Sequence, residues 1–166
     1  MKLRSILYNL FRRKEESTAD TSPQKGISLS RYLGRWYEQA RYENWFEAGL
    51  DEVFTDYSAG PSGSINILNC GRNGSGRQST SKGRGFPQSG GLMKVSFVPP
   101  YAWFRASYHI LYVDQEYRTA LVSGQDSAHL WLLTRERIPS SDSINNLLAE
   151  ARKRGFDLSR LRFTRQ

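Results

Sequence analysis

Few side chains in this sequence could carry out chemistry. The chain has a single thiol, Cys70, and two imidazoles, His109 and His129. Both histidines lie in runs with strand-like alternation, and neither has a Ser or Asp at the spacing of a nucleophilic catalytic group. The sequence also lacks a glycine-rich phosphate loop, a metal-ligand cluster and a nucleophile elbow. It therefore predicts a protein that is not an enzyme, with no catalytic residue, no cofactor and no metal.

Composition limits the class of protein. A length of 166 residues suits one domain and a tail, and such a chain can bury a sizeable core. A mean hydropathy of -0.62 with 24% charged residues excludes an integral membrane protein. Aromatic residues, at 13%, favour strands and an aromatic-lined pocket. One cysteine excludes an intramolecular disulfide, so the sequence shows no adaptation to an oxidising compartment.

The basic charge raises the question of a partner. The net charge is +8 and the pI about 9.8, values that nucleic-acid-binding proteins share. The basic residues do not form one stripe, because they gather near the two ends of the chain. They include Lys2, Arg4, Arg12, Arg13, Lys14, Arg152, Lys153, Arg154, Arg160, Arg162 and Arg165. These basic side chains either form a solvated surface or attract the protein to anionic lipid headgroups. We predict no nucleic-acid partner.

The first 29 residues are predicted to be a tail. Residues 1–14 are amphipathic at helical spacing, with an apolar stripe surrounded by Lys and Arg. That stripe consists of Leu3, Ile6, Leu7, Leu10 and Phe11. Residues 15–28 are polar and contain Ser, Thr, Pro and Gly, which predicts a linker. Residues 1–14 are expected either to lie on an anionic membrane surface or to form a disordered tail.

Export signals are weak in this tail. The uncharged run 5–11 is short, Arg12 and Arg13 follow it directly, and no small-residue cleavage site or lipid-attachment cysteine comes after. The sequence alone therefore predicts a cytoplasmic or peripheral-membrane location.

Short strands with turn residues between them follow from residue 32 onward. Strands are expected at 34–42, 52–59, 64–70, 77–85, 92–98, 107–113, 118–123 and 129–134. Residues 99–104 are predicted to form a loop with exposed aromatic side chains. One helix is expected at 141–153, because Ser140 or Ser141 can cap its start, Asp142 lies in its first turn and Gly155 can end it. Leu161 and Phe163 suggest a short last strand.

Three segments of the chain resemble a known family. Gly34-Arg35-Trp36 comes first, Asp114 and Tyr117 come before 120–122, and the run 131–135 ends in Arg135. In this order they resemble the three motifs of the lipocalins, especially bacterial lipocalins and apolipoprotein D. The resemblance covers residues 30–166. It implies an all-β domain: an eight-stranded antiparallel up-and-down β-barrel with a C-terminal α-helix packed outside.

The resemblance also implies how the barrel is closed. A small barrel needs its ends covered, since water would otherwise enter the core. A Trp on the first strand can cover one end, and an Arg across its indole adds ~0.5–2 kcal/mol. The family pairs the Trp of its first motif with the Arg of its third, which here are Trp36 and Arg135.

If Trp36 and Arg135 point into the barrel, the alternation of side chains along each strand predicts which of their neighbours also point inward. Glu38 and Ala40 share the face of Trp36, and Met93, Val95 and Phe97 form an apolar face. Tyr57 and Asn69 match pocket positions of chains similar to apolipoprotein D, which leaves Cys70 facing outward. The predicted ligand-binding residues are Glu38, Ala40, Tyr57, Asn69, Met93, Val95, Phe97, Tyr108, Trp131 and Leu133.

The resemblance implies binding, storage or transport of a small lipophilic ligand, a fatty acid or a lysophospholipid, in a membrane-maintenance role. Two alternatives remain: a barrel filled by its own side chains that acts as an interaction module at an anionic membrane, and a lipocalin-type isomerase that uses Cys70. A homodimer is left open. The family also offers the outer membrane or periplasm as an alternative location.

Overall fold

The computed structural model describes residues 19–101 and 105–166. The predicted amphipathic stretch 1–14 and part of the predicted loop 99–104 lie outside the described residues. No helix within the described ranges is long and apolar enough to cross a membrane.

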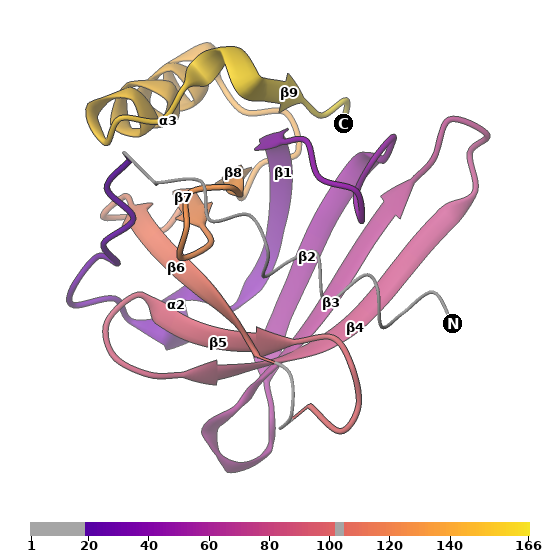
Figure 1. Cartoon of the computed structure of the whole chain (residues 1–166), viewed down its shortest axis with the longest axis vertical. Helices are drawn as coiled ribbons and strands as arrows, with labels where there is room; N and C mark the ends of the chain where they lie inside the picture. The colour runs from indigo at the N-terminus through magenta and orange to yellow at the C-terminus, as the bar shows by residue number, and fades with distance from the viewer. Residues whose placement is uncertain (1–18, 102–104) are drawn as a thin grey trace.

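Antiparallel strands dominate the structure (Figure 1). They are β1 (Gly34–Tyr42), β2 (Asp51–Ala59), β3 (Ile65–Arg72), β4 (Gln78–Pro87), β5 (Leu92–Ser96), β6 (Ala106–Val113), β7 (Thr119–Ser123), β8 (Leu130–Thr134) and β9 (Leu161–Phe163). Each strand from β2 to β7 pairs with the next along the chain, and β1 pairs with both β8 and β2. The first eight strands therefore close into an up-and-down barrel, which confirms the predicted fold.

Within residues 19–101 and 105–166 the helices are few and short, apart from one. They are α2 (Leu29–Tyr32), the 3-10 turns η1 (Pro61–Gly63) and η2 (Leu158–Arg160), and α3 (Ser141–Lys153). Helix α3 has the predicted limits, and the Ser140 hydroxyl caps it by accepting a hydrogen bond from the Ser143 amide. It lies outside the barrel, as predicted, and β9 continues the sheet beside β1 (Figure 1).

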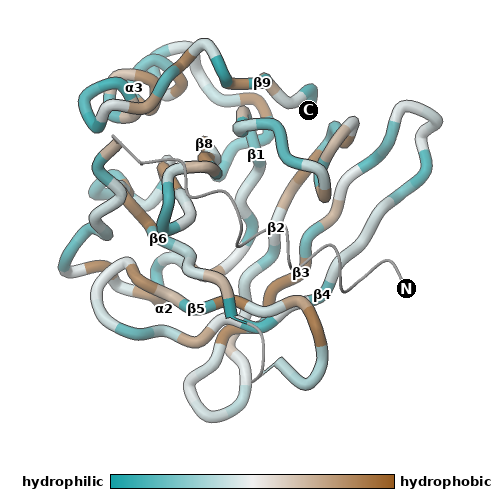
Figure 2. The backbone as a smooth tube through the Cα atoms, viewed as in Figure 1, coloured by the Kyte–Doolittle hydropathy of each residue, from teal (hydrophilic) through white to brown (hydrophobic). Residues whose placement is uncertain are grey.

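Buried apolar residues form two clusters, one on each side of the sheet. The first fills part of the barrel interior and includes Trp36, Met93 and Ile110. The second lies between the outer wall and α3, and it includes Leu121, Leu132 and Leu147 of the helix. Apolar stretches recur along the barrel strands, whereas the projecting β3–β4 hairpin is mostly hydrophilic (Figure 2).

The segment before α2 is part of the fold and not a free linker. The Gln24 amide donates to the Ile110 carbonyl at 2.8 Å, and the Gln24 carbonyl accepts from Gly91. The Gln24 side-chain oxygen accepts from the Val113 amide, and the Asp20 amide donates to the Arg154 carbonyl. Residues 20–28 therefore lie along β6, although their polar composition predicts a linker. Composition missed these bonds because they use main-chain groups and one glutamine side chain.

One end of the barrel, beside α2, is closed by Trp36 and Arg135. The Arg135 guanidinium carbon lies 4.0 Å from the centroid of the fully buried Trp36 ring. Trp36 donates from its indole nitrogen to the Tyr32 carbonyl at 2.8 Å, which ties the ring to α2. Arg135 also donates to main-chain carbonyls at this end, those of Arg31, Tyr32, Leu33, Arg35 and Tyr117. One side chain thus joins α2, β1, β8 and the turn before β7.

We predict that Arg135→Ala lowers the free energy of unfolding by ~2–4 kcal/mol, because it removes a cation–π contact and charged hydrogen bonds to carbonyls that stay partly buried. Arg118→Ala is the matched control, since Arg118 pairs with Glu136 on the exposed surface and its loss should cost under ~1 kcal/mol. Denaturant unfolding of both variants measures the difference. Equal midpoints for the two variants would contradict this role of Arg135.

Candidate functional site

The strand register identifies the inner face of the barrel. Trp36 lies opposite Thr55, Thr55 opposite Asn69, and Asn69 opposite Ser81. Directly paired residues share a face, so all four side chains point inward with Trp36. Trp36 is fully buried, Thr55 and Asn69 are partly buried, and Ser81 is exposed. The inner face therefore becomes more accessible away from Trp36, toward the end formed by loops 43–50, 73–77 and 124–129, which we call the mouth.

Most residues predicted to line the interior do face it. Tyr57, Met93, Val95, Tyr108, Trp131 and Leu133 belong to the inner apolar cluster or pack against it. Glu38 is 2% exposed and lies two residues beyond Trp36 on β1. Phe97 is 39% exposed, and its ring lies against Gly83, where an added Cβ would come within 2.6 Å of it. A side chain at position 83 would displace the ring.

Ala40 is the exception, and its expected inward placement is wrong. The pairing of β1 with β8 shifts between Glu38 and Ala40, which marks a β-bulge at Gln39. A bulge adds one residue to a strand and reverses the alternation beyond it. Ala40 therefore packs in the outer cluster beneath α3, and Arg41 takes the inward direction. Strict period-two counting from Trp36 could not detect this shift.

Three tyrosine hydroxyl groups meet inside the barrel. The Tyr108 hydroxyl lies 2.8 Å from the hydroxyl of Tyr32 and 2.8 Å from that of Tyr57. Burial raises the pKa of Tyr57 to about 12 and that of the other two phenols well above the usual value. All three hydroxyls are therefore uncharged hydrogen-bonding groups at neutral pH. Sequence analysis selected Tyr57 and Tyr108 but missed Tyr32, which comes from α2.

A buried ion pair fills the gap where β1 and β2 separate. Arg41 is fully buried and donates to Glu38 at 2.5 Å and to the Glu47 and Leu50 carbonyls. The Thr164 hydroxyl donates to the same Glu38 oxygen at 2.5 Å. Gln166 bridges the two strands by donating to the Glu38 and Val53 carbonyls. The C-terminal residues thus complete the wall, a role with no signal in the sequence pattern.

Aromatic rings line the mouth around Glu47. One Glu47 carboxylate oxygen accepts from the Trp131 indole at 3.0 Å and from the Asn44 amide at 2.6 Å. His129 stacks on Trp131 at 5.6 Å between ring centroids, and Phe46 stacks on His129 at 5.9 Å. Desolvation lowers the pKa of His129, so the ring is neutral near pH 7. Loop 43–50 is therefore held over the mouth by one carboxylate and a column of rings.

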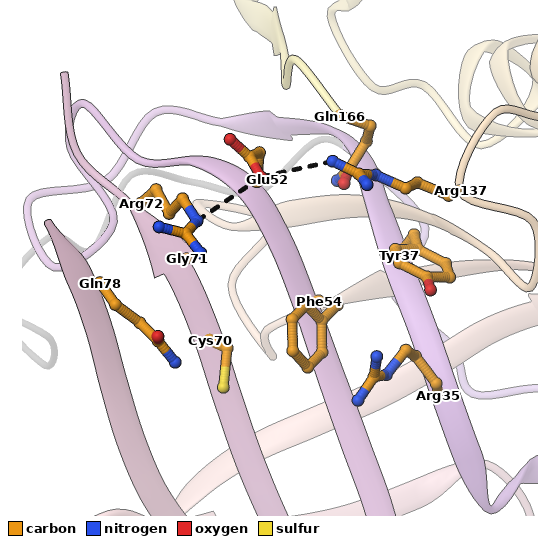
Figure 3. A pocket seen from close by; sticks show the side chains of 10 residues that line it. All are labelled: Arg35, Tyr37, Glu52, Phe54, Cys70, Gly71, Arg72, Gln78, Arg137 and Gln166. Atoms are coloured by element: carbon orange, nitrogen blue, oxygen red, sulfur yellow. Dashed lines mark hydrogen bonds and ion pairs between the residues drawn. The ribbon is translucent and has the colours of Figure 1, made fainter. Parts of the chain in front are cut away.

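Two pockets lie mainly on the outer wall. The first, of about 300 Å³, is lined by Arg35, Tyr37, Glu52, Phe54, Cys70, Gly71, Arg72, Gln78, Arg137 and Gln166 (Figure 3). Phe54 and Cys70 are direct partners across β2 and β3, on the face opposite Thr55 and Asn69. Cys70 therefore faces away from the interior. The second pocket, of about 320 Å³, lies beside Lys82, Arg84 and Tyr101.

Residues suited to metal binding do not gather in the described part of the chain, where no three His, Cys, Asp or Glu side chains are grouped to hold a metal ion. The His109 ring nitrogen lies 2.7 Å from the Thr21 carbonyl, and the His129 ring stacks on Trp131. The histidines therefore have structural contacts.

Comparison with known proteins agrees with this geometry. The model of the Lipocalin-like domain matches residues 27–166. The chain belongs to the lipocalin family. It is 38% identical over 156 residues to the outer membrane lipoprotein Blc of Escherichia coli K12, covering 87% of this chain and 86% of that protein. The Vibrio cholerae protein of the same name is 35% identical over 149 residues, with 87% and 85% covered.

Solved structures share this lipocalin's fold at low sequence identity. The cockroach allergen Per a 4 superposes with a TM-score of 0.72 at 15% identity, over 92% of this chain and 96% of the allergen. Such low identity supports the fold alone. The motifs around Trp36, Asp114 and Arg135 therefore identified the family correctly, as the relatives in bacteria show.

The buried Glu38 predicts a pH dependence of stability. Desolvation, and then the negative charge of Glu47, raise its pKa to about 7 against the attraction of Arg41. The folded state therefore holds the proton more tightly than the unfolded state, whose carboxyl titrates near 4.5. This contribution is full below the unfolded pKa and is lost as the pH rises to about 7, by at most ~3 kcal/mol.

We predict that Glu38→Gln removes this dependence, because an amide cannot titrate. The difference in unfolding free energy between the native protein and the variant should change between pH 4.5 and 7, in the direction that favours the native protein at the lower pH. Glu52→Gln, on the exposed surface, is the control and should leave the native profile unchanged. Parallel profiles of the native protein and Glu38→Gln would show that Glu38 stays ionised.

Proposed function

We propose that this lipocalin binds one single-chain lipid, a fatty acid or a lysophospholipid, inside the barrel and stores or carries it. One observation carries the proposal: the inner face is apolar and buried near Trp36 but accessible at Ser81 and Asn69 toward the mouth. An apolar interior with a few polar groups and one open end suits a ligand with a long apolar chain and one polar end. Membership in the lipocalin family supports the same class of ligand.

The free energy of burying an acyl chain is large enough for micromolar binding of a single-chain lipid. Burying a chain of roughly 15 methylenes gives ~12 kcal/mol at ~0.8 kcal/mol each, before the costs of ordering and association are subtracted. A dissociation constant between micromolar and high nanomolar follows, equivalent to about -8 to -10 kcal/mol. We propose no enzymatic activity, since Cys70 faces the outer wall and the histidines have structural contacts.

We propose a location at the cell envelope, at an outer-membrane or periplasmic surface. The relatives in Escherichia coli and Vibrio cholerae are named outer membrane lipoproteins, which supports this alternative over a cytoplasmic one. Such a site would serve membrane maintenance, because single-chain lipids arise where membrane lipids are damaged or turned over. Residues 1–14 would add attraction to anionic headgroups through their basic side chains.

We predict that calorimetric titration with a lysophospholipid or a long-chain fatty acid gives a dissociation constant below about 10 μM. Trp131→Ala should weaken binding about tenfold, because it removes a large inward ring and releases Glu47. Phe54→Ala is the matched control, since it removes a ring from the outer pocket and should leave affinity unchanged.

The reverse pattern in these two variants would place the ligand in the outer pocket of Figure 3. Failure of every lipid to bind below about 100 μM would favour the alternative of a filled barrel acting as an interaction module.

The membrane contribution of residues 1–14 is predicted separately. The full chain should sediment with anionic vesicles at low salt and be released at high salt, since each basic residue contributes ~1 kcal/mol near such a surface. A chain that begins at Ala19 keeps the segment hydrogen-bonded along β6 and should remain in solution. Vesicles of neutral lipid are the control. Equal sedimentation of the two chains with anionic vesicles would exclude this role for residues 1–14.

A further inference from the structure

An anionic ligand head group would need a free cation inside the barrel, and the polar groups described there do not supply one. Among the described residues, the carboxylates of Glu38 and, at the mouth, Glu47 face the interior, and the Arg41 guanidinium donates to Glu38 and to the Glu47 carbonyl. The two terminal nitrogens of Arg41 are already bonded to carboxylates, to the Thr164 hydroxyl and to carbonyls of loop 43–50. No terminal nitrogen of this guanidinium is left for a ligand anion among the contacts of the described residues, and its one unpartnered donor, Nε, is fully buried.

The hydroxyl cluster offers uncharged donors instead. Three phenols share two hydrogen bonds, so two of their three protons are used between them and one is left for another oxygen. Tyr108 is the middle member and is partly exposed as a whole residue, whereas Tyr32 and Tyr57 are buried. When both neighbours donate to Tyr108, its own proton is directed outward from the cluster, and such chains strengthen the final donor.

A second uncharged donor lies on the same inner wall. The Thr55 hydroxyl donates to the side-chain oxygen of Asn69 at 2.7 Å. This bond orients the Asn69 amide so that its NH₂ group points away from Thr55. Asn69 is partly accessible, and Tyr57 is on the same strand as Thr55 and on the same face. Hydroxyl and amide donors therefore follow one another along β2 and β3, on an otherwise apolar wall.

From this arrangement we infer that the barrel selects a single-chain lipid with an uncharged oxygen, an ester carbonyl or a hydroxyl, over an ionised fatty acid. Tyr108 is the specificity-determining donor. An uncharged oxygen gains a hydrogen bond from Tyr108 and leaves no charge buried. A carboxylate would lose its hydration without gaining a cation, and it would lie in the field of Glu38 and Glu47. This inference rests on the proposed lipid-binding function and names the ligand class within it.

The test compares ligands of one chain length. We expect 1-monomyristoylglycerol to bind at least tenfold more tightly than myristate at pH 8, where myristate is ionised. Diphenylhexatriene, a hydrocarbon probe without oxygen, reports on the apolar interior alone. Tyr108→Phe should weaken monomyristoylglycerol binding about tenfold and leave diphenylhexatriene binding unchanged, which also shows that the variant is folded. Tyr112→Phe on the same strand, beside the outer cluster, should change neither.

A further variant tests the role of charge. Glu47→Gln should strengthen myristate binding severalfold relative to monomyristoylglycerol binding, because it removes a negative charge near the mouth while the amide oxygen can still accept from Trp131. Myristate binding as tight as the ester, or ester binding unaffected by Tyr108→Phe, would overturn the inference while leaving the lipid site in place. Failure of all three ligands, including the hydrocarbon probe, would instead overturn the proposed function.

Discussion

Closure of the barrel at the Trp36 end is the constraint on which the rest of the structure depends. An apolar interior remains dry only if water cannot enter from both ends. Arg135 meets this need by covering the Trp36 ring and donating to the carbonyls that would otherwise face that end. Because one end is sealed, solvent can reach the interior only from the mouth. Burial therefore decreases along the paired residues from Trp36 on β1, through β2 and β3, to exposed Ser81 on β4.

The bulge at Gln39 divides the interior from the wall that α3 covers. Beyond it, Ala40 packs under α3 and Arg41 turns inward to Glu38, so a small side chain serves the helix contact and a large one fills the gap between β1 and β2. Burying an ion pair is costly unless its remaining donors are satisfied. Carbonyls of loop 43–50 and the Thr164 hydroxyl satisfy most of them. The loop at the mouth and the C-terminal residues are therefore parts of one polar cluster.

Much of the fold and part of the site could be predicted from the sequence. Alternation and turn residues located eight strands, and a serine cap at Ser140 or Ser141 with Gly155 as the stop located α3, because these signals are local. Ala40 was misplaced because a bulge leaves no local signature. Tyr32, Arg41 and Gln166 were missed because their roles arise from contacts between distant segments. Residues 20–28 were predicted as a linker because composition does not show main-chain bonds to β6.

The central claim, that a lipid chain lies inside the barrel near its closed end, is tested most directly by NMR. Protein carrying ¹³C-labelled methyl groups at Met93 and Ile110, both fully buried on the inner face, would be mixed with an unlabelled lysophospholipid. The account predicts intermolecular NOEs from the acyl chain to both methyl groups. Contacts restricted to methyl groups of the outer cluster, such as those of Leu147 under α3, would contradict it.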